Sequence, residues 1–136
     1  MQTGDVLPEQ VYTVTRADLV RYAGASGDQN PIHWSDRVAT SVGLPGVIAH
    51  GMFTMALAAR ALDTWAGGPG KVRELGCKFT KPVVVPDDDR GTEVVVAGTV
   101  ASVAEDGALH LTLTVTCEGV KVMGAPKAVL ARAAGG

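Results

Sequence analysis

The sequence GMFTMALAARALDTWA at residues 51–66 decides the fold. It is long enough for a helix of four turns, and its first two turns carry apolar side chains on nearly every side. Such a helix has no solvent face, so we expect it to be enclosed by protein. Polar residues enter only at Arg60, Asp63 and Thr64, and the run Gly-Gly-Pro-Gly at 67–70 then ends the helix.

The residues after this helix have the pattern of strands. Apolar residues alternate with polar or small ones, β-branched residues are frequent, and turn residues at 105–107 and 118–119 separate the runs. The runs are 75–79, 83–85, 93–103, 109–117 and 120–130. The sequence therefore predicts an α+β domain with an antiparallel sheet of four or five strands curled around one apolar helix. This is the hot-dog arrangement, although the pattern alone also fits other α+β folds.

The residues before the helix predict shorter elements. An extended lead-in at 10–14 reaches Thr15 and Asp18, whose spacing is that of a capping box, and we expect a helix from there to about Ala25. Gly, Asp, Asn and Pro at 24–31 predict an irregular loop. A short helix is expected at 35–41.

Length and composition limit the possible functions. A chain of 136 residues fits one domain, 1–136, and nearly half of the residues are apolar. The net charge of −2, with both signs scattered, predicts no nucleic-acid partner and no membrane partner. The amino terminus lacks a signal pattern, so we expect a cytoplasmic protein. Cys77 and Cys117 lie in apolar runs, which favours buried free thiols over a disulfide or a zinc site.

The loop around Asp28 and His33 is the first candidate for chemistry. On a regular helix these two residues would lie about 140° apart, but Gly27 and Pro31 predict a bend that can bring both side chains to one point. A carboxyl and an imidazole together suit a reaction with two proton transfers, such as the loss of water from a 3-hydroxyacyl thioester. A partly desolvated Asp28 held by backbone donors would serve as the acid. The structural alternative is an ordinary turn with a packing histidine.

The start of the long helix is the second candidate. The N–H groups of a first helical turn are free and lie at the positive end of the helix dipole. The N–H of Gly51 can therefore stabilise a thioester oxygen that becomes enolate-like, and the missing side chain lets that oxygen approach. Read in isolation, the same residue is equally well explained as a plain glycine cap.

Together these residues resemble a family. The segment 22–33, YAGASGDQNPIH, followed five residues later by Ala39, is similar to the signature of the MaoC-like hydratases, which include (R)-specific enoyl-CoA hydratases. The segment Ala-His-Gly-Met at 49–52 fits the second block of that family. Residues 30–34 and 65–70 look closest to the B-subunit type of the two-subunit mycobacterial (3R)-hydroxyacyl-ACP dehydratases. The resemblance extends over essentially the whole chain.

The resemblance implies a fold, an activity and a site. The fold would be a hot-dog domain that dimerises, as a homodimer or as a heterodimer with a related subunit. The activity would be reversible dehydration of a (3R)-hydroxyacyl thioester carried by acyl carrier protein or CoA, with no cofactor and no metal. Asp28 and His33 would be catalytic, Gly51 would be the oxyanion donor, and Asn30 and Ser26 would support the substrate site. Tyr22 would also buttress the loop.

Three questions stay open at this level. A non-catalytic partner subunit is one alternative, although this chain keeps both Asp28 and His33. A hot-dog thioesterase is another, but it needs a carboxylate on the central helix, where only Asp63 occurs, late in the helix. Pro126 in the last strand cannot donate to a ladder, so we expect a bulge or an edge there.

Two further expectations concern substrate binding. The small residues Ala56, Ala58 and Ala59 predict an acyl tunnel along the central helix. A carrier protein would bind to a rim of basic side chains. The candidates for such a rim are Lys71, Arg73, Lys78 and Lys81. The alternative is that these are ordinary solvated side chains on strands.

Overall fold

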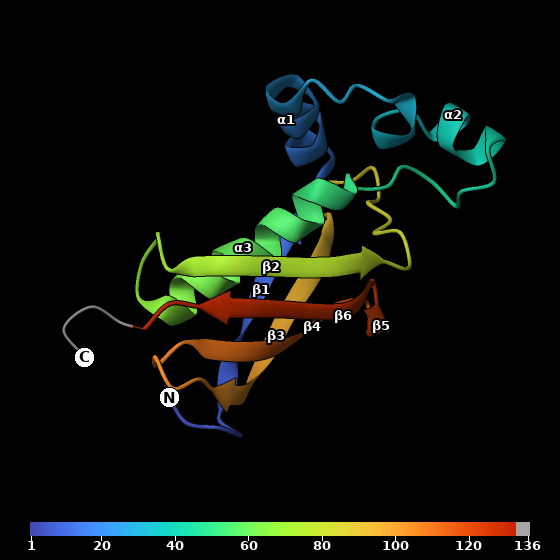
Figure 1. The fold of residues 1–136 in the computed structure, drawn as a ribbon. Coiled ribbons are helices and arrows are strands. Elements are labelled where there is room, and N and C mark those ends of the chain that lie inside the picture. The colour runs from blue at the N-terminus through green and yellow to red at the C-terminus, as the bar shows by residue number, and fades with distance from the viewer. Residues whose placement is uncertain (133–136) are drawn as a thin grey trace.

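The computed structural model describes residues 1–132, so the last four positions of the expected domain lie outside the described residues. The chain forms a sheet with one long helix and a group of shorter helices (Figure 1). In chain order the elements are β1 (Val6–Val14), α1 (Arg16–Ser26), the 3-10 helix η1 (Pro31–His33), α2 (Asp36–Ser41), α3 (Gly51–Ala66), β2 (Val72–Phe79), β3 (Thr92–Val103), β4 (Leu109–Cys117), β5 (Val120–Lys121) and β6 (Met123–Leu130).

The six strands form one antiparallel sheet in the order β1-β3-β4-β6-β2, with β5 paired to β4. The sheet curls past α3 without closing, which confirms the predicted hot-dog arrangement (Figure 1). The strand count was too low because β1 was expected only as a lead-in at 10–14. Pro8 interrupts its alternation, and the register with β3 shifts between Leu7 and Gln10. The run at 83–85 is not a strand and contributes a single bridge, Val84 to Ile48.

The inner side of α3 forms the centre of the core. Leu57, Ala58, Ala61 and Leu62 are almost completely buried against the valines of β3 and β4. Trp65 lies over Gly98, where a Cβ atom would come within 3.0 Å of the indole ring, so only glycine lets the helix approach the sheet this closely. Tight packing of this kind fixes α3 against one face of the sheet.

The outer side of α3 is exposed in the single chain, so the expected enclosure by protein would need a second chain. Met52 is 59% exposed, and Ala56 and Arg60 follow on the same face at intervals of four residues. The reason is that the sheet of one chain covers only one side of the helix (Figure 1). The part of this face formed by Met52 and Ala56 is apolar, and an exposed apolar helix face is typical of an interface.

Pro126 lies in β6, which pairs with β2 on one side and with β4 on the other, the latter only from Lys127 to Leu130. The pairing of β6 with β2 shifts between Gly76 and Lys78, and the neighbouring Ala125 has a positive φ of 45°. The expected bulge is therefore present, and on the β4 side Pro126 lies just before the first paired residue, Lys127, so the alternative of a local edge is also compatible with the pairing. A bulge lets a proline occur inside a sheet without leaving a ladder acceptor unpaired.

Both cysteines are free, as expected. Cys117 is buried beside the Thr92 hydroxyl at 3.2 Å, whereas Cys77 is only half-buried, and burial raises the pKa of its thiol. Among residues 1–132 no helix combines the length and the hydropathy needed to cross a membrane.

Candidate active site

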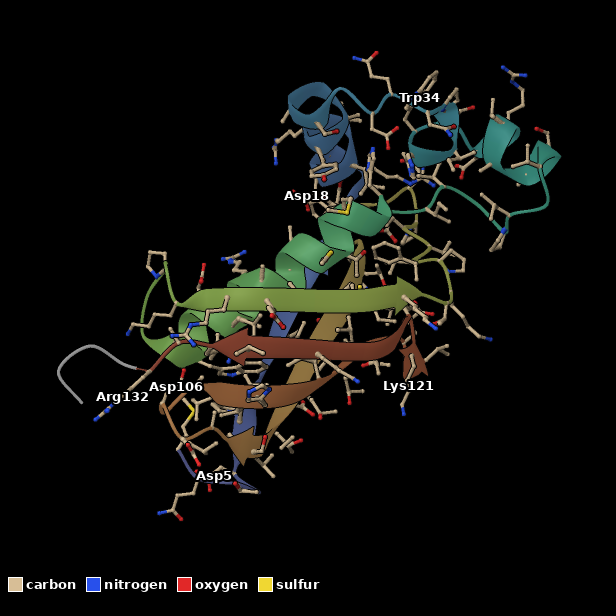
Figure 2. The ribbon with its side chains drawn as sticks, viewed as in Figure 1. Asp5, Asp18, Trp34, Asp106, Lys121 and Arg132 are labelled. Carbon is tan, nitrogen blue, oxygen red and sulfur yellow. The ribbon has the colours of Figure 1, made fainter. Side chains whose placement is uncertain are left out.

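The helices α1, η1 and α2 lie beyond one end of the sheet, next to the start of α3 (Figure 1). The predicted capping box starts α1: the Thr15 side chain accepts a hydrogen bond from the Asp18 N–H, and the Asp18 carboxylate accepts one from the Thr15 N–H. Trp34 projects away from the sheet, and its indole N–H donates to the Gln29 carbonyl at 3.0 Å (Figure 2). These contacts fix the two ends of the loop between α1 and η1.

A series of short turns bends this loop. Gly27 ends α1 in the left-handed region, with φ 78°. Next, the Asp28 N–H donates to Ser26 Oγ at 3.1 Å, and the Asn30 N–H donates to Asp28 Oδ1 at 3.3 Å. Finally, the Ile32 N–H donates to Asn30 Oδ1 at 3.2 Å, which caps η1. The structural reading of the loop as Asx turns is therefore correct, and the turns also determine where Asp28 points.

The Asp28 side chain is exposed in this chain. We expected it to be partly desolvated and held by backbone donors, and within residues 1–132 one backbone donor, the Asn30 N–H, contacts its carboxyl group. The expected desolvation is not found in the single chain, because the loop lies at the surface next to the exposed face of α3. Desolvation of this carboxyl needs a substrate or another protein surface.

His33 is buried, with 7% of its surface exposed. Its Nδ1 lies 2.7 Å from the carbonyl oxygen of Ile48. A carbonyl oxygen only accepts, so the neutral ring carries its hydrogen on Nδ1 and presents Nε2 as the acceptor. The loop thus holds an imidazole in the tautomer that can take up a proton at Nε2.

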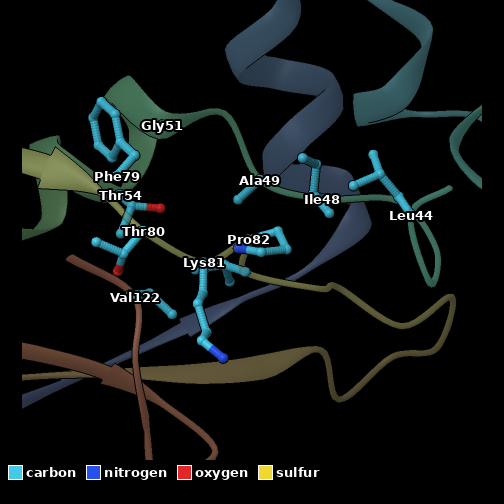
Figure 3. Close-up of a pocket in the computed structure, with 11 residues that line it drawn as sticks. Leu44, Ile48, Ala49, Gly51, Thr54, Phe79, Thr80, Lys81, Pro82 and Val122 are labelled. Atoms are coloured by element: carbon cyan, nitrogen blue, oxygen red, sulfur yellow. The ribbon is translucent and has the colours of Figure 1, made fainter. Parts of the chain in front are cut away.

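Gly51 is the first residue of α3, so helix geometry leaves its N–H without an intrahelical acceptor. It lines an open cavity, of which the other residues are Tyr22, Ser26, Asp28, His50, Met52 and Phe79. The Phe79 ring lies against Gly51, and a Cβ atom on Gly51 would come within 3.1 Å of that ring (Figure 3). The missing side chain therefore lets Phe79, a residue that is 53% exposed, pack its ring against the start of α3.

A second cavity of about 410 Å³ shares Gly51 and Phe79 with the first (Figure 3). Its walls come from the segment before α3 and the segment after β2, and they include Leu44, Ile48 and Val83. The expected tunnel along α3 does not match this arrangement, because Ala58 is fully buried in the core and Ala56 is exposed. An acyl chain beside Gly51 would instead lie between these two segments.

The expected basic rim is dispersed. The Lys71 ammonium group donates to the Ala66 carbonyl, and Arg73 pairs with Asp106 at 3.2 Å. Only Lys81 borders the cavity beside Gly51, while Lys78 lines a groove on the sheet. The four side chains do not form one rim.

His50 is the site residue that the sequence reasoning did not assign. It is 2% exposed, its ring stacks on that of His33 with centroids 3.8 Å apart, and its Nε2 lies 3.0 Å from the Asp28 carbonyl oxygen. Ligand-type atoms of Asp28, His33 and His50 all lie within 4.8 Å of one another. The signal available in the sequence was its place directly before Gly51, at the start of an apolar helix.

Three such side chains can in principle hold a metal ion. A metal bound by two imidazoles lies in the plane of each ring, about 2.1 Å from each nitrogen. The rings of His33 and His50 stack face to face, with centroids 3.8 Å apart and 22° between their planes, so an ion in the plane of one ring lies well out of the plane of the other. This geometry favours proton transfer and hydrogen bonding over metal binding.

Comparison with known proteins connects this geometry to a family. Residues 2–117 match the model of the MaoC like domain. The chain is 43% identical over 79 residues to 3-hydroxyacyl-thioester dehydratase X of Mycobacterium tuberculosis, an alignment that covers 58% of this chain and 27% of that protein. A solved structure of a MaoC-like dehydratase superposes with a TM-score of 0.93 at 34% identity, covering 97% of this chain and 41% of that one.

The similarity of this chain to a two-subunit dehydratase is a similarity of fold. The HadBC complex (3R-hydroxyacyl-ACP dehydratase) of Mycobacterium tuberculosis, truncated at a C terminus, matches with a TM-score of 0.68 at 20% identity, covering 95% of this chain and 97% of that chain. The chain spans about a quarter of the length of dehydratase X and two fifths of the more similar solved structure. The family model nevertheless covers most of the sequence, and the chain belongs to the MaoC-like domain family.

Proposed function

We propose that this chain catalyses the reversible dehydration of a (3R)-hydroxyacyl thioester to the trans-2-enoyl thioester. The observation that carries the proposal is the convergence of Asp28 and His33 beside the first N–H of α3. Their polar atoms lie within 4.8 Å, and Asp28 and Gly51 border the same cavity. The names of the relatives support the substrate class, because dehydratase X acts on 3-hydroxyacyl thioesters.

The reaction needs one proton removed and one proton delivered. In the dehydration direction a base takes the proton from C2, and the electron pair moves onto the thioester oxygen. The C2=C3 double bond then forms as the C3–O bond breaks, and the hydroxyl group leaves as water after it receives a proton. Nε2 of His33 and the carboxyl group of Asp28 are the two groups that can exchange these protons, either directly or through one water held between them.

Gly51 would stabilise the intermediate. The negative charge on the thioester oxygen develops only as the C2 proton leaves, so an N–H donor fixed there stabilises the transition state more than the bound substrate. The N–H of Gly51 lies at the positive end of α3 and is free of intrahelical bonding. The aromatic ring of Phe79 beside it would shield the oxygen from water.

Asn30 and Ser26 have supporting roles in this proposal. Both accept hydrogen bonds from backbone N–H groups of the loop, and these bonds set the direction of the Asp28 carboxyl. Ser26 also borders the cavity that contains Asp28, so its hydroxyl group can contact a bound substrate.

We further propose that the active form is a dimer, with itself or with a related subunit. The Met52 and Ala56 face of α3 and the exposed Asp28 loop are next to one another, so a second chain there would enclose both. The HadBC complex, which shares this fold, consists of two different subunits. The proposal takes either acyl carrier protein or CoA as the carrier of the substrate.

Two alternatives make different predictions. A non-catalytic partner subunit would not need both Asp28 and His33, and this chain holds them together. A thioesterase would need a carboxylate near the bound thioester. Asp63, however, lies about 18 Å along α3 from Gly51 at 1.5 Å per residue. The arrangement favours the dehydratase.

The direct test is turnover by the purified protein. Trans-2-enoyl thioesters of CoA and of acyl carrier protein, with chains of different length, are offered, and the loss of the enoyl absorbance is followed. We expect hydration to the (3R)-hydroxyacyl thioester, identified by chiral chromatography of the released acid. Release of free thiol without hydration would support the thioesterase instead. Absence of both activities in the isolated chain and in the dimer would overturn the proposal.

A further inference from the structure

His50 links the two groups of the proposed acid–base pair. It precedes the first residue of α3, yet its side chain makes no capping hydrogen bond to the helix. Instead the imidazole points into the protein, where 2% of the residue is exposed, between the loop that carries Asp28 and the ring of His33. A buried polar side chain is normally placed by its hydrogen bonds, so the partners of this ring indicate what it does.

The first contact determines the tautomer of His50. Its Nε2 lies 3.0 Å from the carbonyl oxygen of Asp28, which can only accept. Nε2 therefore carries the hydrogen, and this bond holds the backbone of Asp28 in addition to the turns of the loop. In the neutral ring Nδ1 is then an acceptor, and it is buried without a hydrogen-bond partner within the described residues. Such an arrangement lowers stability and is kept only where another requirement dominates.

The second contact is with the ring of His33. The two imidazoles stack with centroids 3.8 Å apart and 22° between their planes. The Tyr22 ring packs edge-on against His50 at 4.7 Å and against Phe53 at 5.3 Å. His33 is thus held in its plane by a ring that is itself fixed by α1 and α3, while its Nδ1 is held by Ile48.

We propose that His50 is the positioning residue of the acid–base pair: its Nε2–H fixes the backbone of Asp28, and its ring face fixes the imidazole of His33. This inference rests on the proposed function. It predicts that His50 affects the rate of proton transfer through Asp28 and His33 and not the binding of the thioester.

Two substitutions separate the two contacts. His50→Phe keeps a flat ring that can stack on His33 but removes the donor to Asp28. His50→Gln keeps an amide N–H that can reach the Asp28 carbonyl but removes the ring. His110→Phe, at the exposed histidine on β4, is the matched control for the same chemical change. Thermal unfolding followed by circular dichroism checks that each variant is folded.

The expected result is a loss of kcat with little change in KM. Removing one hydrogen bond that positions a reacting group should lower kcat of His50→Phe about 10-fold or more. His50→Gln should retain more activity than a variant without either contact, such as His50→Ala. In an Asp28→Asn background, His50→Phe should cost little more, because a residue that acts through Asp28 has nothing left to position. A general packing defect would instead lower the rate by the same factor in both backgrounds.

The outcomes for the inference and for the proposed function are distinct. A wild-type protein without hydratase activity contradicts the proposed function. If the wild type is active and the folded His50→Phe variant keeps kcat within about twofold, only the role of His50 is overturned. A change of about twofold is the range expected of neutral surface substitutions. Nitrogen-15 NMR of the imidazoles provides a test without mutation. We expect hydrogen on Nε2 of His50 and on Nδ1 of His33, and hydrogen on Nδ1 of a neutral His50 would overturn the inference.

Discussion

Replacement of Gly51 by proline removes one N–H group from the site and should leave the fold intact. Proline is favoured at the first position of a helix, where its missing N–H has no intrahelical acceptor. The preceding residue, His50, has φ −59° and ψ 137°, an extended conformation of the kind that a residue before proline adopts. The Thr54 N–H still donates to the His50 carbonyl, at 3.2 Å, so the first turn keeps its hydrogen bond.

The magnitude follows from the role proposed for that N–H. Loss of one oxyanion donor typically lowers kcat about 10² to 10³-fold, which is about 2.7 to 4 kcal/mol. Gly51→Ala is the matched control, because both new side chains place a Cβ atom about 3.1 Å from the same Phe79 ring, and alanine keeps the N–H. The Phe79 side chain is half exposed and can turn away, so we expect a smaller loss for alanine.

The assay is hydration of a trans-2-enoyl thioester by wild type, Gly51→Ala and Gly51→Pro, with kcat and KM measured separately. Circular dichroism checks that the total helix content of each protein is unchanged. We expect kcat to fall much further for proline than for alanine. Equal losses in both variants would show that Gly51 matters for space alone, and full activity of Gly51→Pro would refute the oxyanion role.

Three further predictions follow from the surface of the chain, its cavities and its ion pairs. Sedimentation at micromolar concentration should show a dimer, because the outer face of α3 is apolar and exposed, and a stable active monomer would contradict this. Phe79→Ala should join the two cavities that meet at Gly51 and shift kcat/KM toward longer acyl chains; an unchanged profile would place the acyl chain elsewhere. The Val47 N–H and the Arg16 guanidinium lower the pKa of the Asp36 carboxyl below its ordinary value, so the unfolded chain takes up this proton at higher pH than the folded chain. The stability that Asp36 contributes should be complete above the ordinary aspartate pKa of about 3.9 and disappear as the pH falls through the lower folded value; a melting-temperature difference between wild type and Asp36→Asn that stays constant from about pH 6 to about pH 3 would contradict it.

The parts of the fold that local sequence determines were predicted well. Helix α3 runs from Gly51 to Ala66, as expected. Its residues favour a helix, and Gly67 ends it in the left-handed region. The capping box at Thr15 likewise fixed the start of α1. Strand β1 was underestimated because Pro8 and the bulge beside it disturb the alternation on which the prediction depended.

The parts of the site that depend on tertiary contacts could not be predicted. The position of Phe79 over Gly51 joins residues 28 apart in the chain, and no local pattern indicates it. The role of His50 depends on a stacked ring and on a carbonyl group 22 residues away, so its sequence neighbours show only that it precedes the helix. The exposure of Asp28 and Met52 has a different cause, because one sheet covers only one side of α3.

The pairing of Asp28 with His33 is the centre of the account, and Asp28→Asn tests it most directly. Asparagine keeps an oxygen that can accept from the Asn30 N–H, so the loop should keep its turn, but it can neither donate nor accept the catalytic proton. The measurement is kcat for hydration of a trans-2-enoyl thioester by folded wild type, Asp28→Asn, His33→Gln and the double variant. The account predicts that each single change removes most of the activity and that the double change costs little more, because the two groups act as a unit. A folded Asp28→Asn protein with turnover near that of the wild type would contradict it.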